Sequence, residues 1–385
     1  MRGRAMAGVA LALTALLLVG REVFLAPVPR PRVAPEPTRQ VLRVWVIEEW
    51  VGSDAWLEKQ AAVFARTRPG LGLRIRRAQA ADLWQPEAVL PDVLIYGLGA
   101  VTDPQALFAP LYAESPVRDE LAVAGRWQGE QWGQPLAMGG YVLLLDARQY
   151  PPGTAMGRDA LLAASRAAKG KQAARYGLQC PADGSLAYPT ALLAQAGALG
   201  GGWMQGIATL RGTALPTDFA ACAPEKAYQD FAAGQAAALL GTQRDARRFQ
   251  ALAAAGKGFE CYALPCAQPF TDQLLLGSVL ADAARDVARQ SLCAAFLAHL
   301  ARPEAQQDLT DYGLLPVRAD VPGYDPGHAP TLYALAQSLA GPGVWVPNAY
   351  DWAAQRGALR ERTAMALAQG GVDVGAALLA LGGGG

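Results

Sequence analysis

Short apolar runs and stretches of helical spacing alternate along the first part of the chain. Residues 41–47 (VLRVWVI) are rich in β-branched and aromatic side chains and predict a strand. A helix is predicted to begin at Ser53 or Asp54, whose side chains can cap free backbone N–H groups. Two further runs, 71–75 and 91–96, predict the next strands. The order strand, helix, strand is typical of a βαβ unit with a parallel sheet, which places the chain in the α/β class.

The same alternation continues to the end of the chain. Apolar runs at 141–145 and 236–240 predict two more strands, and we expect the second to end at Gly241. Helical spacing, with proline favoured in a first turn and glycine after a last one, predicts helices at residues 225–233, 286–301, 303–313, 356–368 and 374–381. A chain of 385 residues with this many elements has room for two domains.

The N-terminus carries the pattern of an export signal. Arg2 and Arg4 precede an apolar run at residues 5–19, which is short for a membrane span of about 20 residues. No cysteine follows this run, which excludes a lipoprotein anchor. We therefore expect residues 1–26 to be a signal peptide or an N-terminal membrane anchor, and residues 27–40 to be a proline-rich linker. The folded body would then lie outside the cytoplasm, at the cell surface or in the periplasm, either secreted or anchored.

Composition narrows the chemistry that the chain can perform. Hydrophobic residues make up 52%, charged residues 17%, and the net charge is +1, so a large core is expected and a nucleic-acid partner is not. The chain has two histidines, and it contains no phosphate-binding glycine loop, zinc-protease motif or nucleophile elbow. We predict no catalytic residue, metal or cofactor. Cys261 and Cys266 are close enough for a small-loop disulfide, but the pairing among all five stays open: Cys180, Cys222, Cys261, Cys266 and Cys293.

Several segments together resemble the bacterial extracellular solute-binding proteins of family 1, the maltose-binding type. The resemblance runs in order through LRVWVIEEWVGSDAWLEKQAAVFARTRPGLGLRI, PDVLIY, GEQWGQPLAMGGYVLLLDARQY, EKAYQDFAAGQAAALLGTQRD and FLAHLARPEAQQDLTDYGLLPVRADV. It implies a two-lobed periplasmic-binding-protein-like fold (type II), with an interlobe ligand cleft and several hinge crossings. One lobe would hold residues 41–138 and 268–314, and the other would hold residues 139–267 and 315–385. Crossings are expected near residues 138–140, 264–270 and 314–316.

Ligands of open α/β sheets bind beyond the carboxyl ends of the strands, and this rule selects loops for the binding site. A sugar would need carboxylates, amides or arginine for its hydroxyls and flat aromatic rings for its faces. The candidates are Glu48, Glu49, Trp50, Trp56, Gly97, Tyr141, Trp203, Gln243, Arg244, Asp245, Tyr262, Asp272, Trp345 and Asn348. Several have a structural alternative. Glu48 or Glu49 can be solvated at a strand end, and Trp50 can cover the core. Trp56 can pack against its lobe, Asp245 can cap the next helix, and Tyr141 can belong to a crossing.

The resemblance implies the extracellular solute-binding protein of an ABC importer. It would bind a carbohydrate or a similar small polar solute and deliver it to the permease subunits as a monomer, with the N-terminal segment as its membrane contact. Two alternatives stay open. One is an extracytoplasmic bilobal enzyme, a transferase or hydrolase. The other is a solute sensor for a membrane signalling protein.

Overall fold

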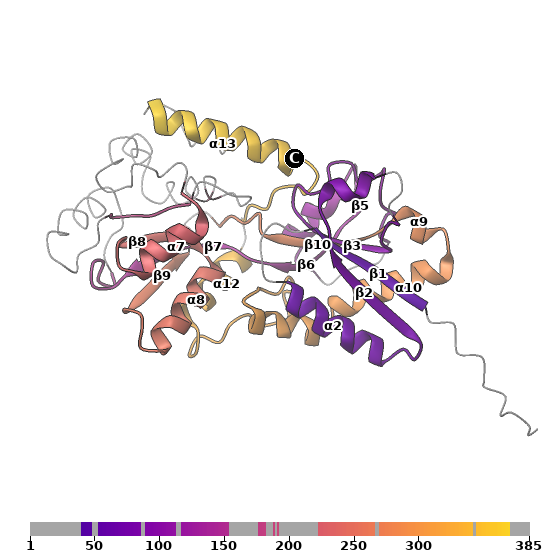
Figure 1. Ribbon diagram of the computed structural model, residues 1–385, viewed down its shortest axis with the longest axis horizontal. Helices are drawn as coiled ribbons and strands as arrows, with labels where there is room; N and C mark the ends of the chain where they lie inside the picture. The colour runs from indigo at the N-terminus through magenta and orange to yellow at the C-terminus, as the bar shows by residue number, and fades with distance from the viewer. Residues whose placement is uncertain are drawn as a thin grey trace, which may run out of the picture. The chain divides into compact units, whose positions relative to one another are not determined.

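The computed structural model describes residues 40–47, 53–85, 89–112, 117–153, 176–181, 188, 191, 222–265, 269–341 and 344–369. Five strands form the first sheet (Figure 1), in the order β2 (Leu71–Arg77), β1 (Gln40–Ile47), β3 (Val93–Gly97), β10 (Leu274–Val279) and β6 (Gln134–Met138). β1 and β3 pair in parallel, with Val44 opposite Val93, whereas β10 runs antiparallel to both β3 and β6. The predicted parallel pairing therefore holds for β1 and β3, and the sheet as a whole is mixed.

Burial explains the composition of these strands. Every residue of β3 and of β10 is buried, as expected for strands that neighbours cover on both sides. β2 lies at an edge, where charged residues such as Arg74 and Arg76 discourage pairing with another chain. β6 lies at the opposite edge and contains Pro135, a residue that sheets tolerate at an edge.

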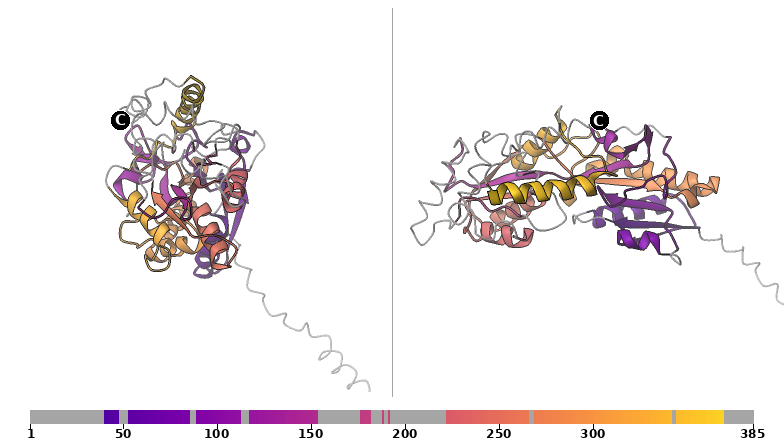
Figure 2. Two further views of the ribbon diagram at one scale, coloured as in Figure 1. Left: turned by 90° about the vertical axis from the view of Figure 1, so that its left-hand side faces the viewer. Right: turned by 90° about the horizontal axis from the view of Figure 1, so that it is seen from above.

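Two long helices accompany the first sheet. α2 (Asp54–Arg66) buries Leu57, Ala61 and Phe64, so the predicted apolar spacing is confirmed. Its Phe64 ring meets Phe296 of α10 (Val287–Leu300) edge-on, with 5.2 Å between ring centroids. The remaining short elements of this part are η1 (Ala80–Trp84), α3 (Asp119–Ala122), η2 (Val123–Gly125), β4 (Arg126–Trp127), β5 (Glu130–Gln131), α9 (Ala281–Ala284), α11 (Pro303–Gln307) and η4 (Asp308–Tyr312). Two further views show the orange α10 beside the purple strands (Figure 2).

A second sheet has three strands and antiparallel pairing throughout. β7 (Tyr141–Asp146) lies in the middle, between β8 (Ala238–Thr242) and β9 (Cys261–Pro265). β7 is buried along its whole length, since other strands cover both of its edges. The helices that pack against this sheet are α7 (Pro224–Ala232), α8 (Gln243–Ala254) and α12 (Pro330–Ala340) (Figure 1). The last described helix is α13 (Trp352–Gln369).

The chain passes between the two sheets at short connections. β6 of the first sheet ends at Met138 and β7 of the second begins at Tyr141, so two glycines separate them. The return runs from β9 to β10, and Leu315 pairs with Met138 through hydrogen bonds of 2.8 and 3.0 Å. These passages coincide with the expected crossings. The bounds of the two lobes stay a prediction.

Several predicted boundaries are wrong in detail. β8 extends through Gly241 to Thr242, because the glycine leaves room for the Asp245 side chain that folds back on it. The predicted helix 303–313 is α11 followed by a 3-10 turn, and it ends at Gly313 with a φ of +77°. The sequence interpretation missed β6, β9, β10 and α12. The predicted helix 374–381 lies outside the described residues, and no described helix is both long and apolar enough to cross a membrane.

Candidate functional site

Polar and aromatic side chains gather where the chain passes between the sheets. We call this group the crossing cluster, and its members are Gly139, Gly140, Tyr141, Gln243, Phe270, Thr271, Asp272, Gln273, Trp345 and Trp352. Four of the predicted binding residues belong to it: Tyr141, Gln243, Asp272 and Trp345. The structure thus brings together predicted residues that are far apart in the sequence.

A buried carboxylate lies at the centre of the crossing cluster. Asp272 is 5% exposed and accepts hydrogen bonds from the Tyr141 hydroxyl at 2.7 Å and from the Trp352 indole N–H at 3.1 Å. Burial raises the pKa of Asp272, and these two hydrogen bonds partly oppose that shift because they favour the carboxylate form. Asp272 therefore anchors a tyrosine and a tryptophan in fixed orientations.

Two glutamines converge on the glycine pair. Gln243 Oε1 accepts a hydrogen bond from the Gly140 N–H at 2.8 Å, and the Gly140 carbonyl accepts one from the Gln243 N–H at 3.0 Å. Gly139 donates to the Gln273 carbonyl at 2.7 Å and accepts from the Thr271 hydroxyl at 2.7 Å. The backbone at this passage is thus held by polar side chains on two sides.

Aromatic rings form one wall of the crossing cluster. Tyr141 stacks on Phe270, with ring centroids 5.7 Å apart and an interplanar angle of 8°. Phe270 in turn contacts Trp345 at 4.9 Å, and Trp345 meets Trp352 edge-on at 6.2 Å. Tyr188 approaches Tyr141 edge-on from the other side at 5.4 Å. Trp345 is the half-buried member of this wall, whereas Tyr141, Phe270 and Trp352 are buried.

The N-terminus of α8 adds two predicted residues to this region. Arg244 lies exposed in the first turn. Asp245 is not the N-cap that the sequence suggested, because the helix begins at Gln243 and Thr242 occupies the N-cap position. Asp245 instead accepts hydrogen bonds from the Thr242 N–H at 2.9 Å and from its hydroxyl at 3.1 Å. The bond from the Thr242 N–H is one half of a capping box, and the Thr242 side chain accepts from the Asp245 N–H to complete it. Burial raises the pKa of Asp245, and the hydrogen bonds from Thr242 oppose this shift.

Four other predicted residues lie apart from the crossing cluster. The Trp56 indole is fully buried and donates to the Ala305 carbonyl at 2.9 Å, which is the packing alternative. Gly97 ends β3 within the sheet, opposite Leu275. Asn348 donates to the Arg126 carbonyl at 2.7 Å. Tyr262 donates to the Pro151 carbonyl at 3.3 Å. Glu48, Glu49, Trp50 and Trp203 lie outside the described residues.

The sequence interpretation passed over Thr271, Gln273 and Trp352. Thr271 and Gln273 flank the predicted Asp272, so the segment that reaches β10 contributes three polar residues in a row. All three are buried. Three consecutive polar residues directly before a continuous apolar run are a signal that could have identified this segment. Trp352 was missed because the helix was predicted to begin four residues later than it does.

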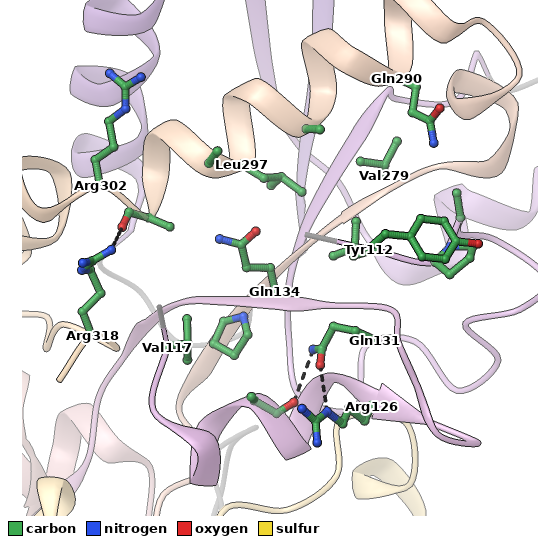
Figure 3. Close-up of a pocket in the computed structure, with 18 of the residues that line it drawn as sticks. Tyr112, Val117, Arg126, Gln131, Gln134, Val279, Gln290, Leu297, Arg302 and Arg318 are labelled. Carbon is green, nitrogen blue, oxygen red and sulfur yellow. Dashed lines mark hydrogen bonds between the residues drawn. The ribbon is translucent and has the colours of Figure 1, made fainter. Parts of the chain in front are cut away.

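A separate cavity of about 860 Å³ lies beside the first sheet (Figure 3). One face of α10, the start of β6 and the segments around α3 line it, and no predicted site residue within the described ranges does so. Two of the arginines that line it already bond within the protein. Arg318 donates to the Ala301 carbonyl at 3.0 Å, and Arg126 donates to Gln131 at 3.2 Å. We therefore place the candidate site at the crossing cluster rather than at this cavity.

Two of the described cysteines have thiols of raised pKa. Cys261 and Cys293 carry free thiols, and burial raises the pKa of each to about 12. A thiol with so high a pKa is a poor nucleophile. Cys266 lies outside the described residues, so the predicted disulfide with Cys261 is not described. Within the described ranges, no group of three His, Cys, Asp or Glu side chains is placed to hold a metal ion.

Comparisons with known proteins agree with this geometry. A family model described as bacterial extracellular solute-binding protein matches residues 88–333, which is well over half of the chain. No curated protein matches the chain. Among solved structures, the GacH receptor of Streptomyces glaucescens, which was also crystallised with acarbose, has a TM-score of 0.65 at 16% identity. The match covers 89% of this chain and 98% of the receptor.

Two further solved structures show how widely the fold is used. The maltose/maltodextrin-binding domain of Bdellovibrio bacteriovorus, bound to maltotriose, gives a TM-score of 0.59 at 17% identity, covering 89% of this chain and 97% of that one. Thiaminase I from Bacillus thiaminolyticus gives 0.61 at 17% identity, covering 85% and 99%. At such identities the likeness concerns the fold, and it confirms the predicted two-lobed α/β class of the type II binding proteins.

Proposed function

The chain belongs to the bacterial extracellular solute-binding proteins, and from this membership we propose that it captures a carbohydrate or a similar small polar solute between its two lobes. It would deliver that solute to the permease of an ABC importer. It would act as a monomer outside the cytoplasm, with residues 1–26 as its signal peptide or membrane anchor.

The observation that carries this proposal is the composition of the crossing cluster. Buried amides, a carboxylate and a set of aromatic rings lie together at the passages between the sheets. Amides and carboxylates satisfy hydroxyl groups, and rings cover the apolar faces of a sugar. Arg244 is exposed and Trp345 is half-buried, so we expect these two predicted residues to meet a solute first.

A screen of thermal stability tests this function. The full chain, purified in detergent, would be heated with maltotriose, xylotriose or glucose, and with spermidine or glucose 6-phosphate as controls. Because a ligand that binds the folded state stabilises it by about 2.7 kcal/mol at a concentration of 100 Kd, a bound sugar should raise the melting temperature by a few degrees. A response to spermidine or glucose 6-phosphate, with none to any sugar, would contradict the carbohydrate assignment.

An enzyme on the same scaffold is the second candidate. The likeness in fold to thiaminase I is the observation that favours it. The raised thiol pKa values of Cys261 and Cys293 weigh against either of them as a nucleophile. Chromatography of each solute after long incubation with the protein separates the two functions, since a binding protein returns the solute unchanged.

A further inference from the structure

Gln273 carries an unpaired donor in a buried position. Its side chain is 1% exposed, and its Nε2 makes no hydrogen bond. A buried polar group without a partner destabilises the fold, and such groups are rare enough in native proteins to require a reason. Among the described residues, the other buried atoms of this kind are Arg118 Nε, Gln179 Oε1 and His299 Nε2, all outside the crossing cluster.

The position of Gln273 suggests that reason. A Cβ atom on Gly139 would meet both Gln273 Oε1 and Gln243 Nε2, so the two amide groups converge over this glycine. Gln243 uses its Oε1 to accept from Gly140. The amide of Gln273, with its unpaired Nε2, therefore adjoins the passage from β6 to β7.

The surroundings select the charge of the partner. Asp272 is adjacent in sequence, and its carboxylate is bonded to Tyr141 and Trp352. An anionic guest would be repelled by this buried carboxylate, and a cationic guest would bring donors to groups that are donors already. An uncharged acceptor oxygen avoids both conflicts.

We propose that Gln273 Nε2 binds one uncharged acceptor oxygen of the solute, such as a hydroxyl or ring oxygen of a sugar. This inference rests on the proposed function, because it assumes that the solute reaches the crossing cluster. Gln273 then determines specificity: it selects neutral, oxygen-rich solutes over anions and amines. Its unpaired donor destabilises the unliganded protein and gains its partner on binding.

Substitution of Gln273→Met tests the inference, because methionine keeps the length and removes the amide. Thermal-shift titrations of the full chain with maltotriose, xylotriose and glucose give an apparent Kd for the wild type and for each variant. Loss of one hydrogen bond to an uncharged group should weaken binding about tenfold. The unliganded variant should melt at or above the wild-type temperature, since an unsatisfied group is gone. If Gln273→Met does not fold, Gln273→Asn keeps an amide but shortens its reach, and the same weakening is expected.

Gln179→Met is the matched control. Gln179 is also a fully buried glutamine with an unpaired amide atom, but it lies beside β8 and donates to Asp230 at 2.9 Å. This variant should melt lower and bind the sugar as the wild type does. Unchanged sugar affinity in Gln273→Met, with a wild type that binds, would overturn the role of Gln273 and leave the proposed function intact. A wild type that responds to none of the three sugars would overturn both.

Discussion

The hydrogen bond between Tyr141 and Asp272 should contribute more to stability than an ordinary buried tyrosine contact. Its donor is 1% exposed, its acceptor is a buried carboxylate, and the distance is 2.7 Å. Hydrogen bonds to charged groups contribute about 1.5–3 kcal/mol, against about 1 kcal/mol for neutral pairs. We therefore expect Tyr141→Phe to lower the free energy of unfolding by about 2–3 kcal/mol at neutral pH.

Tyr150→Phe provides the matched control for this prediction. The Tyr150 hydroxyl is equally buried but donates to a neutral acceptor, the Gly177 carbonyl, at 2.9 Å. Its loss should cost about 1 kcal/mol and should not depend on pH. Urea unfolding followed by tryptophan fluorescence measures both variants, since the chain carries nine tryptophans.

The pH dependence of the cost of Tyr141→Phe provides a second test. Because burial raises the folded-state pKa of Asp272 above its ordinary value of 3.8, the folded state takes up this proton before the unfolded state as the pH falls. The carboxyl group therefore destabilises the protein above its folded pKa, and this penalty disappears as the pH drops toward the ordinary value. Since Tyr141 favours the charged form, the cost of Tyr141→Phe should shrink over the same range. Equal costs for the two variants at neutral pH, or a Tyr141→Phe cost that acid leaves unchanged, would refute the reasoning.

Two further variants probe the fold around this region. Asp92 is buried and bonded to Arg43 and Arg289; burial raises its pKa, but those hydrogen bonds outweigh burial and leave the pKa below 3.8. The stabilisation by the Asp92 carboxylate is thus complete above its unfolded-state pKa and is lost as the pH falls through its folded-state pKa. Asp92→Asn should lower the free energy of unfolding by about 3 kcal/mol at neutral pH and should reduce the loss of stability in acid. A variant that loses as much stability in acid as the wild type would argue against this. Gly139→Ala places a methyl group against two amides and should cost about 1–3 kcal/mol in urea unfolding, whereas a neutral result would mean that the amides can move aside.

The sequence predicted those parts of the fold that local pattern determines. β1, α2, β3 and α10 were found because the apolar spacing that identifies them acts within a few positions along the chain. β10 was missed because a short apolar run is equally compatible with a helix. β6 was missed because its proline argues against a strand unless the strand is known to be an edge. That knowledge comes only from the assembled sheet.

The candidate site was predictable in part for the same reason. Gln243 was selected because it follows a predicted strand, and Tyr141 and Asp272 were selected because they adjoin expected crossings; the three do lie in one cluster. Gln273 could not be chosen in this way, because its significance is the lack of a partner, which no pattern of residues reveals. Asp245 was a candidate both for binding and for helix capping, and its hydrogen bonds go to Thr242 at the start of α8, whereas its role in binding stays a prediction.

Hydrogen bonds join the passages between the sheets to one another. Met138 pairs with Leu315, Gly139 with Gln273, and Thr271 donates its N–H to the Trp345 carbonyl at 3.1 Å. If the two lobes close over a captured solute, all of these segments should bend at once, since each is bonded to the next. A substitution that disturbs this backbone ladder, such as Gly139→Ala, should therefore change stability and solute affinity in the same direction. Gln273→Met leaves the ladder intact, because the Gln273 carbonyl belongs to the backbone. It should therefore separate the two quantities, with affinity falling while stability does not.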